Sequence, residues 1–282
     1  MGVTHVVRGS EYLTSTPKYV LLYDAYGWER PTYVHLHLLR GKDAEGNISK
    51  LSKRHGAVSF QDLVEDGYLP EAILNYIALL GWCPKNSETE FFNLDELTLA
   101  FTIDGVSKSP AVFDFEKLLW FNGEYIHKLD DEKFTELIEK FIKVEIPENI
   151  NKSKMLGLLK TRIAKLSEIN EKMEFFITLP EYEKELFLNK KNKIADFDIV
   201  KTVLTEAKDI LGGVDSFDND TLFAALMPIT EKLSIKTGTL MWCVRIAVSG
   251  MSATPGGATE IMEVIGKEES LKRIDLALTK LA

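Results

Sequence analysis

The sequence predicts a short α/β segment followed by a mainly helical remainder. The first 40 residues show a strand, a helix and a second strand in that order. Signals for strands fade after about residue 129. From there on, apolar residues recur at the helical spacing i, i+3, i+4 and i+7. A strand–helix–strand of this length is typical of a parallel βαβ crossover. Because a buried parallel strand that opens at residue 3 has no sheet to join, we interpret this segment as part of a larger α/β domain.

The elements of this segment follow from local signals. The β-branched run 4–9 predicts a strand, and Thr16 with Pro17 predicts a helix start, because threonine can cap a helix and proline tolerates its first position. The helix is expected to run to about Tyr26 and to end at Gly27. A second strand is expected over residues 33–39.

The next stretch combines a polar loop with short helices. Residues 40–56 are polar and contain three glycines, so we expect a loop there. Pro70 and Gly81 delimit a predicted helix, and Asn93 with Glu96 forms the pattern of a capping box before another. Asp114 is expected to cap a third helix that ends near Gly123.

The C-terminal half is predicted to be all-helical. Apolar stripes cover residues 134–142, 199–210 and 271–281, with Gly212 and Gly213 ending the second, and Pro228 is expected to kink a long helix.

Composition excludes several classes of protein. The chain has 282 residues and a net charge of −9, which argues against an indiscriminate nucleic-acid coat. It contains no apolar run long enough to span a membrane, and its start lacks the features of a secretory signal. Cys83 and Cys243 lie far apart, outside any metal-binding spacing, so both are expected in the core and the cytoplasm is the expected location. The four tryptophans are also expected to be mainly core residues.

The segment Lys50-Leu51-Ser52-Lys53-Arg54 is the most informative one for chemistry. It places three cations within five residues, close to glycines and just after the predicted sheet. Lysine ammonium groups can offset the charge that builds on a transferring or departing phosphate. Taken alone, the segment is either a phosphate clamp or a solvated basic loop.

The order of several motifs resembles bacterial glutamyl-tRNA synthetase. The motifs are VVRG (6–9), STPK (15–18), HLHLL (35–39), KLSKRHG (50–56), LPEAILNYIALLGW (69–82), LMWCVRIAVSG (240–250) and TEIMEVIG (259–266). This resemblance implies half of a Rossmann fold with a KMSKS-like loop over residues 1–56, a mixed α/β stem-contact region over 57–128 and a helical anticodon-binding domain over 129–282. The family's earlier HIGH motif has no counterpart here, so a truncated synthetase, inactive by itself, is expected.

The resemblance also implies roles for individual residues. Lys50 and Lys53 would be catalytic, and Lys50, Leu51, Ser52, Lys53 and Arg54 would bind ATP, which brings Mg²⁺ with it. Arg8 would bind a carboxylate of glutamate; a structural ion pair is the alternative. Tyr12 replaces a histidine that is frequent in the family, and His37 stands where proline is usual. His35 and His37 alone are too few ligands for a metal, and no protein-bound metal is predicted.

A basic segment points to RNA. Lys152, Lys154, Lys160, Arg162 and Lys165 cluster without an acidic neighbour, and on a helical wheel Lys154, Arg162 and Lys165 share one polar sector. These three residues and Arg245, inside an apolar helix, are candidate tRNA contacts. A solvated face is the alternative for the first three, and an ion pair for Arg245.

We therefore expect a glutamate–tRNA ligase whose partners are tRNA-Glu, ATP and glutamate, and which is a cytoplasmic monomer without membrane contact. A non-catalytic tRNA-binding module is the main alternative, and a helical interaction protein without nucleic acid is the third.

Overall fold

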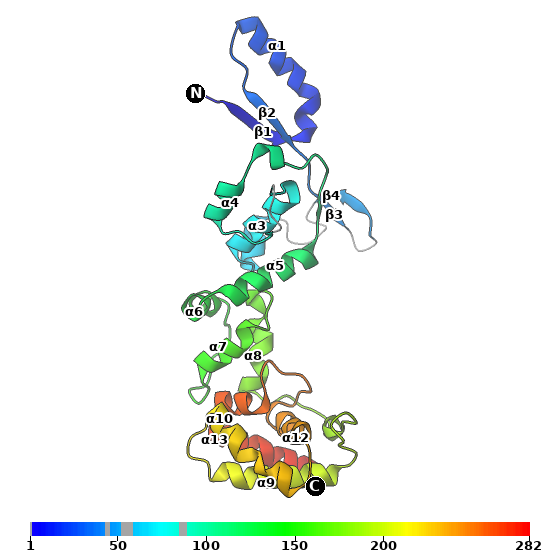
Figure 1. The fold of residues 1–282 in the computed structure, drawn as a ribbon, viewed down its shortest axis with the longest axis vertical. Helices are drawn as coiled ribbons and strands as arrows, with labels where there is room; N and C mark the ends of the chain where they lie inside the picture. Colours follow the sequence, from blue (N-terminus) through cyan, green and yellow to red (C-terminus); the bar gives the residue numbers. More distant parts are fainter. Residues whose placement is uncertain (1, 43–45, 52–58, 85–88) are drawn as a thin grey trace. The chain divides into compact units, whose positions relative to one another are not determined.

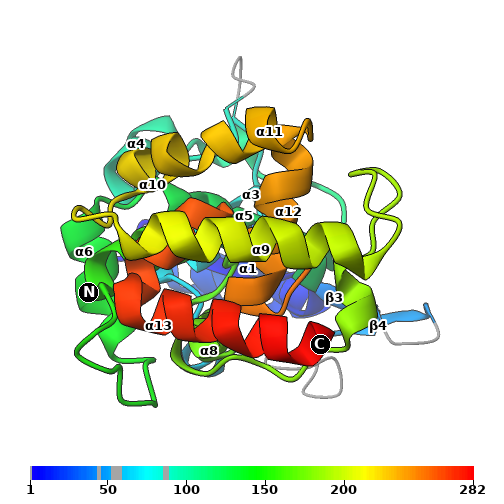
Figure 2. The same cartoon turned by 90° about the horizontal axis from the view of Figure 1, so that it is seen from below.

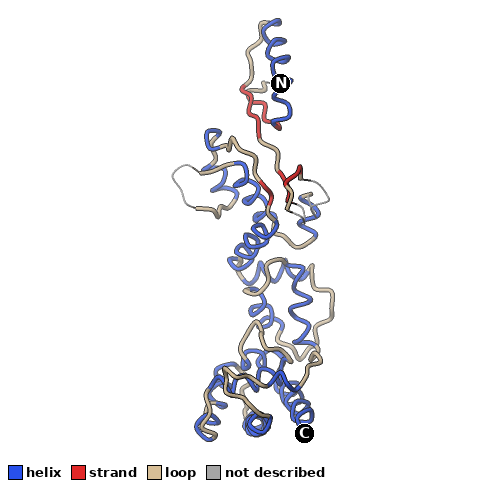
Figure 3. Tube along the Cα trace, turned by 90° about the vertical axis from the view of Figure 1, so that its right-hand side faces the viewer, coloured by secondary structure: helices blue, strands red, loops and turns tan. Residues whose placement is uncertain are grey.

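The computed structural model describes residues 2–42, 46–51, 59–84 and 89–282. The chain forms two compact units, one ending at Lys128 and one beginning at Leu129 (Figure 1). In the described part, all strands belong to the first unit, whereas the second consists of helices and loops (Figure 3). The predicted fold class, an α/β portion followed by a helical one, is confirmed.

The first unit opens with the predicted βαβ crossover. Strand β1 (His5–Gly9) pairs in parallel with β2 (Thr32–Leu36), with Val7 opposite Val34 and Arg8 opposite His35. Between them lie the 3-10 helix η1 (Ser10–Ser15) and helix α1 (Thr16–Tyr26).

The two ends of α1 differ in how well they were predicted. Gly27 ends the helix with a left-handed φ of 65°, as expected. The predicted cap at Thr16 is wrong, because Ser15 is the N-cap residue and makes no side-chain cap bond. The Thr16 hydroxyl instead donates to the carbonyl of Tyr12 at 2.9 Å.

A small second sheet occupies part of the segment that was expected to be a loop. Strand β3 (Arg40–Lys42) pairs antiparallel with β4 (Ile48–Lys50) and parallel with β5 (Val112–Phe113). The loop prediction is therefore wrong for these residues. Strands β3 and β4 are short and mostly polar, and β3 is held partly by a strand about 70 residues later, so no local alternation revealed them.

Helices complete the first unit around an aromatic core. They are α2 (Phe60–Glu65), α3 (Pro70–Gly81), α4 (Leu94–Ala100), η3 (Ile103–Gly105) and α5 (Phe115–Lys128). The Asn93–Glu96 capping box is present, and Asp114 accepts from the first backbone N–H groups of α5. That helix continues through Gly123, contrary to prediction, because Gly123 and Ile126 are both buried in its packed face.

The second unit is a set of packed helices. They are α6 (Asp131–Glu139), α7 (Lys152–Lys160), η4 (Leu166–Glu168), α8 (Ile169–Ile177), η5 (Lys184–Phe187), α9 (Phe197–Gly212), α10 (Asn219–Leu226), α11 (Pro228–Lys232), α12 (Thr237–Ser249) and α13 (Ala258–Leu281). Helix α13 packs against both α9 and α12 (Figure 2). Their shared core includes Val203, Val244 and Ile274, all fully buried.

Several predicted details of this unit need correction. The stripe over 134–142 is helical only to Glu139, and Pro228 begins a separate helix instead of kinking a long one. Gly266 interrupts α13 with a φ of 79°. Cys243 is buried as expected, but Cys83 is exposed. Among the tryptophans, Trp82 is buried, whereas Trp28 and Trp120 are at least half exposed. No helix in the described residues is sufficiently long and apolar to cross a membrane.

Candidate functional site

Arg8 is held in a fixed orientation by neutral groups. Its Nε donates to His35 Nε2 at 3.3 Å, and its Nη2 donates to Thr16 Oγ1 at 2.7 Å. The bond from Arg8 requires an unprotonated Nε2 on His35, which lies opposite Arg8 in the β1–β2 register. The crossover therefore brings together a strand residue, its cross-strand neighbour and the first residue of α1.

Three tyrosine rings surround the Arg8 guanidinium. The ring centroids of Tyr12, Tyr19 and Tyr33 lie 5.5, 5.2 and 5.3 Å from its Cζ atom. Such contacts stabilise a cation without neutralising its charge. In the part of the chain that the structure describes, Arg8 has no carboxylate within ion-pair distance, so the structural ion pair considered from the sequence is absent there. An oriented, half-buried and uncompensated guanidinium suits a carboxylate ligand.

The basic KLSKR segment begins at the edge of the small sheet. Lys50 is the last residue of β4, and the Leu51 N–H continues the ladder by donating to the Leu39 carbonyl at 3.2 Å. The Leu51 side chain is half-buried against the core of the first unit. Its position anchors the start of the segment. Ser52, Lys53 and Arg54 lie outside the described residues.

The basic segment of the second unit does not form one helix. Helix α7 ends at Lys160, so Arg162 and Lys165 do not continue the polar sector that contains Lys154. Lys154 pairs with Glu263 at 3.1 Å, and Lys152 and Lys160 also pair with carboxylates. The prediction of one continuous cationic helix face is therefore wrong. The chain turns after α7, where the Arg162 N–H donates to the Leu159 carbonyl.

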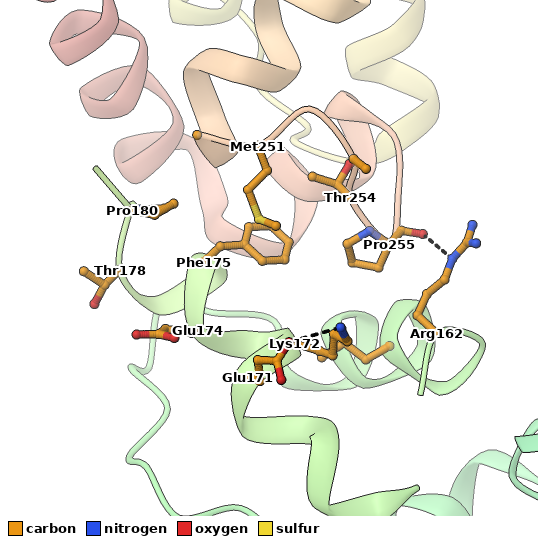
Figure 4. A pocket seen from close by; sticks show the side chains of 13 residues that line it. Arg162, Glu171, Lys172, Glu174, Phe175, Thr178, Pro180, Met251, Thr254 and Pro255 are labelled. Atoms are coloured by element: carbon orange, nitrogen blue, oxygen red, sulfur yellow. Dashed lines mark hydrogen bonds and ion pairs between the residues drawn. The ribbon is translucent and has the colours of Figure 1, made fainter. Parts of the chain in front are cut away.

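Arg162 instead lines a cavity of about 590 Å³ between α8 and the loop after α12 (Figure 4). Its Nε donates to the Pro255 carbonyl at 3.3 Å, which leaves the rest of the guanidinium at the rim. The apolar walls come from Phe175, Pro180, Met251 and Pro255. Lys172, paired with Glu171 at 3.2 Å, adds a second cation. The lining also contains the carboxylates of Glu171 and Glu174. Apolar walls with Arg162 and Lys172 at the rim suit an unstacked base with its phosphate.

Sequence reasoning identified only Arg162 among the residues of this cavity. The loop after Gly250 carries a recognisable signal, because the run Pro255, Gly256 and Gly257 is typical of a turn or loop. Gly250 itself takes a left-handed φ of 66°, and a Cβ there would meet Tyr182 and Pro180. The chain can therefore turn into the cavity wall at this point only without a side chain.

Two arginines of the second unit have opposite environments. Arg273 is fully buried, and its guanidinium donates to the carbonyls of Phe175, Phe176 and Val248 at 2.8 to 2.9 Å. These carbonyls end α8 and α12, the two elements that border the cavity. In contrast, the buried Nε of Arg245 has no hydrogen-bond partner in the described residues. Among the described residues, no carboxylate forms an ion pair with Arg245 either, so the ion pair considered from the sequence is not seen there.

Comparisons with known proteins assign the chain to a family. The model of class I tRNA synthetases (E and Q), catalytic domain, matches residues 1–120, and the anticodon binding domain matches residues 133–278. Glutamate–tRNA ligases of Clostridium tetani and Clostridium kluyveri are 47% and 48% identical over the whole chain, which spans 56% of each relative.

A solved structure gives the same result. The crystal structure of a glutamate tRNA ligase from Elizabethkingia meningosepticum, in complex with its amino acid, has a TM-score of 0.84 and 30% identity. The likeness covers 99% of this chain and 57% of that one. The resemblance expected from the motifs is confirmed: the chain belongs to the glutamate–tRNA ligase family of class I aminoacyl-tRNA synthetases.

Proposed function

We propose that this chain supplies the glutamate-binding arginine, the second ATP-binding signature and the tRNA-binding part of a glutamate–tRNA ligase. In the first step, a carboxylate oxygen of glutamate attacks the α-phosphate of ATP, which forms glutamyl-adenylate and releases pyrophosphate. In the second, the glutamyl group passes to the 3′ end of tRNA-Glu and AMP leaves.

The arrangement of Arg8 carries this proposal. Its side chain is oriented by Thr16 and His35, and neither neutralises it. A guanidinium binds a carboxylate through two parallel N–H bonds, and prior orientation lowers the entropy lost on binding. Glutamate is the carboxylate ligand that the family relationship supplies.

The charge that develops on ATP during the reaction is the reason for the role proposed for the cations of the KLSKR segment. The displacement at the α-phosphate places negative charge on the departing pyrophosphate, and Lys50 and Lys53 are the cations proposed to stabilise it. Leu51 packs against the core and so fixes where the segment starts. Mg²⁺ would arrive with ATP as part of the substrate and would offset phosphate charge.

The cavity of the second unit is the proposed RNA site. A base of the tRNA would stack on Phe175 and Pro255, and Lys172 and Arg162 would face its phosphate. Lys154, Lys165 and Arg245 remain proposed contacts from the sequence. We further infer a monomer that works in the cytoplasm, where tRNA is charged.

Two measurements test the function. In a gel-shift titration at low salt, the chain should prefer tRNA-Glu to an unrelated RNA of equal length, and affinity should fall steeply with salt. ATP–pyrophosphate exchange with glutamate and tRNA should be undetectable for the 282-residue chain alone. Equal binding of both RNAs would contradict the RNA site, and exchange by the chain alone would contradict the expected dependence on the rest of the enzyme.

A non-catalytic tRNA-binding module is the second candidate. The observation that favours it is the fully described helical unit, which contains its own core and the cavity. Persistent tRNA binding without exchange, even after addition of the remaining part of a relative's catalytic domain, would select this candidate.

A further inference from the structure

The segment between η5 and α9 forms a tight turn that carries three lysines. Asn189 and Ile194 pair through two backbone hydrogen bonds of 3.0 Å and so close a turn over residues 190–193, just before the start of α9 (Figure 2). This basic turn contains Lys190, Lys191 and Lys193, all of which are exposed. The whole chain has a net charge of −9, so the basic turn concentrates positive charge on an otherwise acidic molecule.

Contacts on several sides fix the backbone of the basic turn. The Asn189 side chain accepts from the Asn192 N–H at 3.1 Å, and Thr239 Oγ1 on α12 donates to the Asn192 carbonyl at 2.6 Å. Ile194 is 1% exposed and anchors the end of the turn in the core. Lys193 takes a left-handed φ of 58°, which is uncommon for a lysine and persists only where the surroundings hold it. The lysines therefore extend from a backbone of defined conformation.

The positive charge at this end of the unit is not neutralised by ion pairs. A fourth exposed lysine, Lys236, precedes α12, whose first turn contains no acidic residue. In the described residues, no carboxylate lies within ion-pair distance of these four lysines, whereas the lysines of α7 are all paired. Asp196, the next acidic residue after the turn, accepts from the first N–H groups of α9 as its cap.

One segment connects the basic turn to the cavity. Residues 178–194 run along α12 in the opposite direction: Tyr182 packs against Gly250 at the cavity end, and Trp242 Nε1 donates to the Phe187 carbonyl at 3.0 Å midway. The basic turn itself contacts the first turn of α12. Since α12 has 13 residues, the cavity and the basic turn lie about 20 Å apart along it.

The stretch between these two places is mainly acidic. Glu181, Glu183 and Glu185 are exposed there, with Lys184 as the one cation among them. An extended polyanion laid along this stretch would meet three carboxylates, which repel phosphate. A folded polyanion can instead reach the cavity and the basic turn with different parts of its backbone. The charge pattern therefore favours a folded RNA over an extended strand.

We propose that the basic turn, with Lys236 beside it, binds the phosphate backbone of a folded RNA whose unstacked base occupies the cavity. This proposal rests on the proposed function, because the anticodon binding domain that matches residues 133–278 includes the turn. Lysine binds phosphate as a point charge and reads no base. The basic turn therefore adds affinity for any RNA, whereas selection between RNAs comes from base contacts elsewhere.

A membrane surface fits the basic turn less well. Stable attachment to a membrane requires apolar insertion or a lipid anchor in addition to charge. Residues 190–193 contain three lysines and Asn192, and no apolar side chain.

The salt dependence of RNA binding tests the basic turn. The triple variant Lys190→Gln, Lys191→Gln and Lys193→Asn removes three charges, and asparagine tolerates the left-handed conformation at position 193. In gel-shift titrations at several salt concentrations, the slope of log affinity against log salt should fall in magnitude by about 3. Affinity at low salt should fall about tenfold or more. The loss should be equal for tRNA-Glu and for an unrelated RNA of the same length, because phosphate contacts do not read sequence.

A second triple variant is the matched control. Lys133→Gln, Lys140→Gln and Lys143→Gln remove the same charge from exposed positions on and after α6, outside the basic turn. This variant should retain the slope of the unmodified chain, and circular dichroism will verify that both variants fold. An unchanged slope in the basic-turn variant, or an equal reduction in both variants, would overturn the proposal.

The preference for tRNA-Glu separates this proposal from the proposed function. Equal binding of both RNAs by the unmodified chain, with a reduced slope in the basic-turn variant, supports the turn and contradicts the selective RNA site. Selective binding with an unchanged slope in that variant supports the RNA site and overturns the turn. Binding to phosphatidylserine vesicles that depends on the three lysines, with an unchanged RNA slope, would also overturn the proposal and assign the turn to a membrane surface.

Discussion

Arg273 Nε donates to Glu269 Oε1 at 2.8 Å, one turn earlier in the same helix, while the Arg273 side chain is fully buried. The other nitrogens of the guanidinium bind carbonyls at the ends of α8 and α12. One charged side chain therefore satisfies three backbone acceptors and joins the helix ends that border the cavity.

Arg273→Met should destabilise the helical unit strongly. The substitution leaves three carbonyls and the Glu269 carboxylate without their donor, and breaking a buried pair of this kind costs about 3–5 kcal/mol. Urea unfolding followed by circular dichroism should show the loss, and hydrogen exchange should accelerate at the C-terminal ends of α8 and α12. Lys272→Met, at a neighbouring exposed position, should change stability little. Equal effects of both substitutions would contradict the role of Arg273.

The Arg273–Glu269 pair should also make stability depend on pH. Burial raises the pKa of Glu269, but the hydrogen bonds and charges of Arg273 and Lys272 outweigh burial and lower that pKa below its ordinary value of 4.5. A lowered carboxyl pKa in the folded state adds stability above the unfolded pKa, and this stability is lost as pH falls through the folded pKa. Glu269→Gln should therefore flatten the stability profile between about pH 5 and pH 3. An unchanged profile in this variant would contradict the assignment.

Local signals predicted the βαβ crossover well, because Pro17 and Gly27 act within their own helix. The β3–β5 pairing was missed, since it joins Arg40 to Val112 across the chain. The basic segment was misinterpreted for a related reason. No residue between Lys160 and Lys165 is a typical helix stop, although α7 ends at Lys160. Ile163, which follows this end, is 1% exposed. Its burial is a tertiary effect that the local sequence does not show.

In the candidate site, too, the sequence identified individual residues but not the tertiary contacts that hold them. Arg8 and the KLSKR segment were identified from their motifs, and the roles assigned to them remain predictions. The contacts of Arg8 with His35 and Thr16 depend on the register of β1 against β2, which the sequence does not specify. Arg273 has no motif signal beyond the i, i+4 spacing from Glu269, and two of its three carbonyl partners lie almost 100 residues away on α8.

Glutamate binding should depend on the shape of the Arg8 side chain. Arg8→Lys keeps the charge but loses the fork that binds two carboxylate oxygens, so affinity for glutamate should fall about tenfold or more. Titration of the chain with ¹³C-labelled glutamate, followed by NMR, measures this change. Arg30→Lys is the control, because Arg30 is exposed and pairs with Asp24. Comparable losses in the two variants would contradict a specific role for Arg8.

The support given by His35 can be tested separately. His35→Gln retains an acceptor for Arg8 Nε and should preserve most of the glutamate affinity, whereas His35→Leu removes the acceptor and should weaken binding. If both variants bind equally, the hydrogen bond does not position Arg8.

Substitutions in the cavity should separate the effect of charge from that of wall shape in RNA binding. Lys172→Ala should weaken tRNA binding and lower the magnitude of its salt slope by about 1, because one phosphate contact is lost. Thr254→Val should leave the slope unchanged, since it alters the wall of the cavity without removing a charge. Lys133→Ala is the matched control, because Lys133 pairs with Glu136 on α6 outside the cavity. Gel-shift titrations at several salt concentrations measure all three, and equal slopes for Lys172→Ala and Lys133→Ala would remove the cavity from the RNA-binding surface.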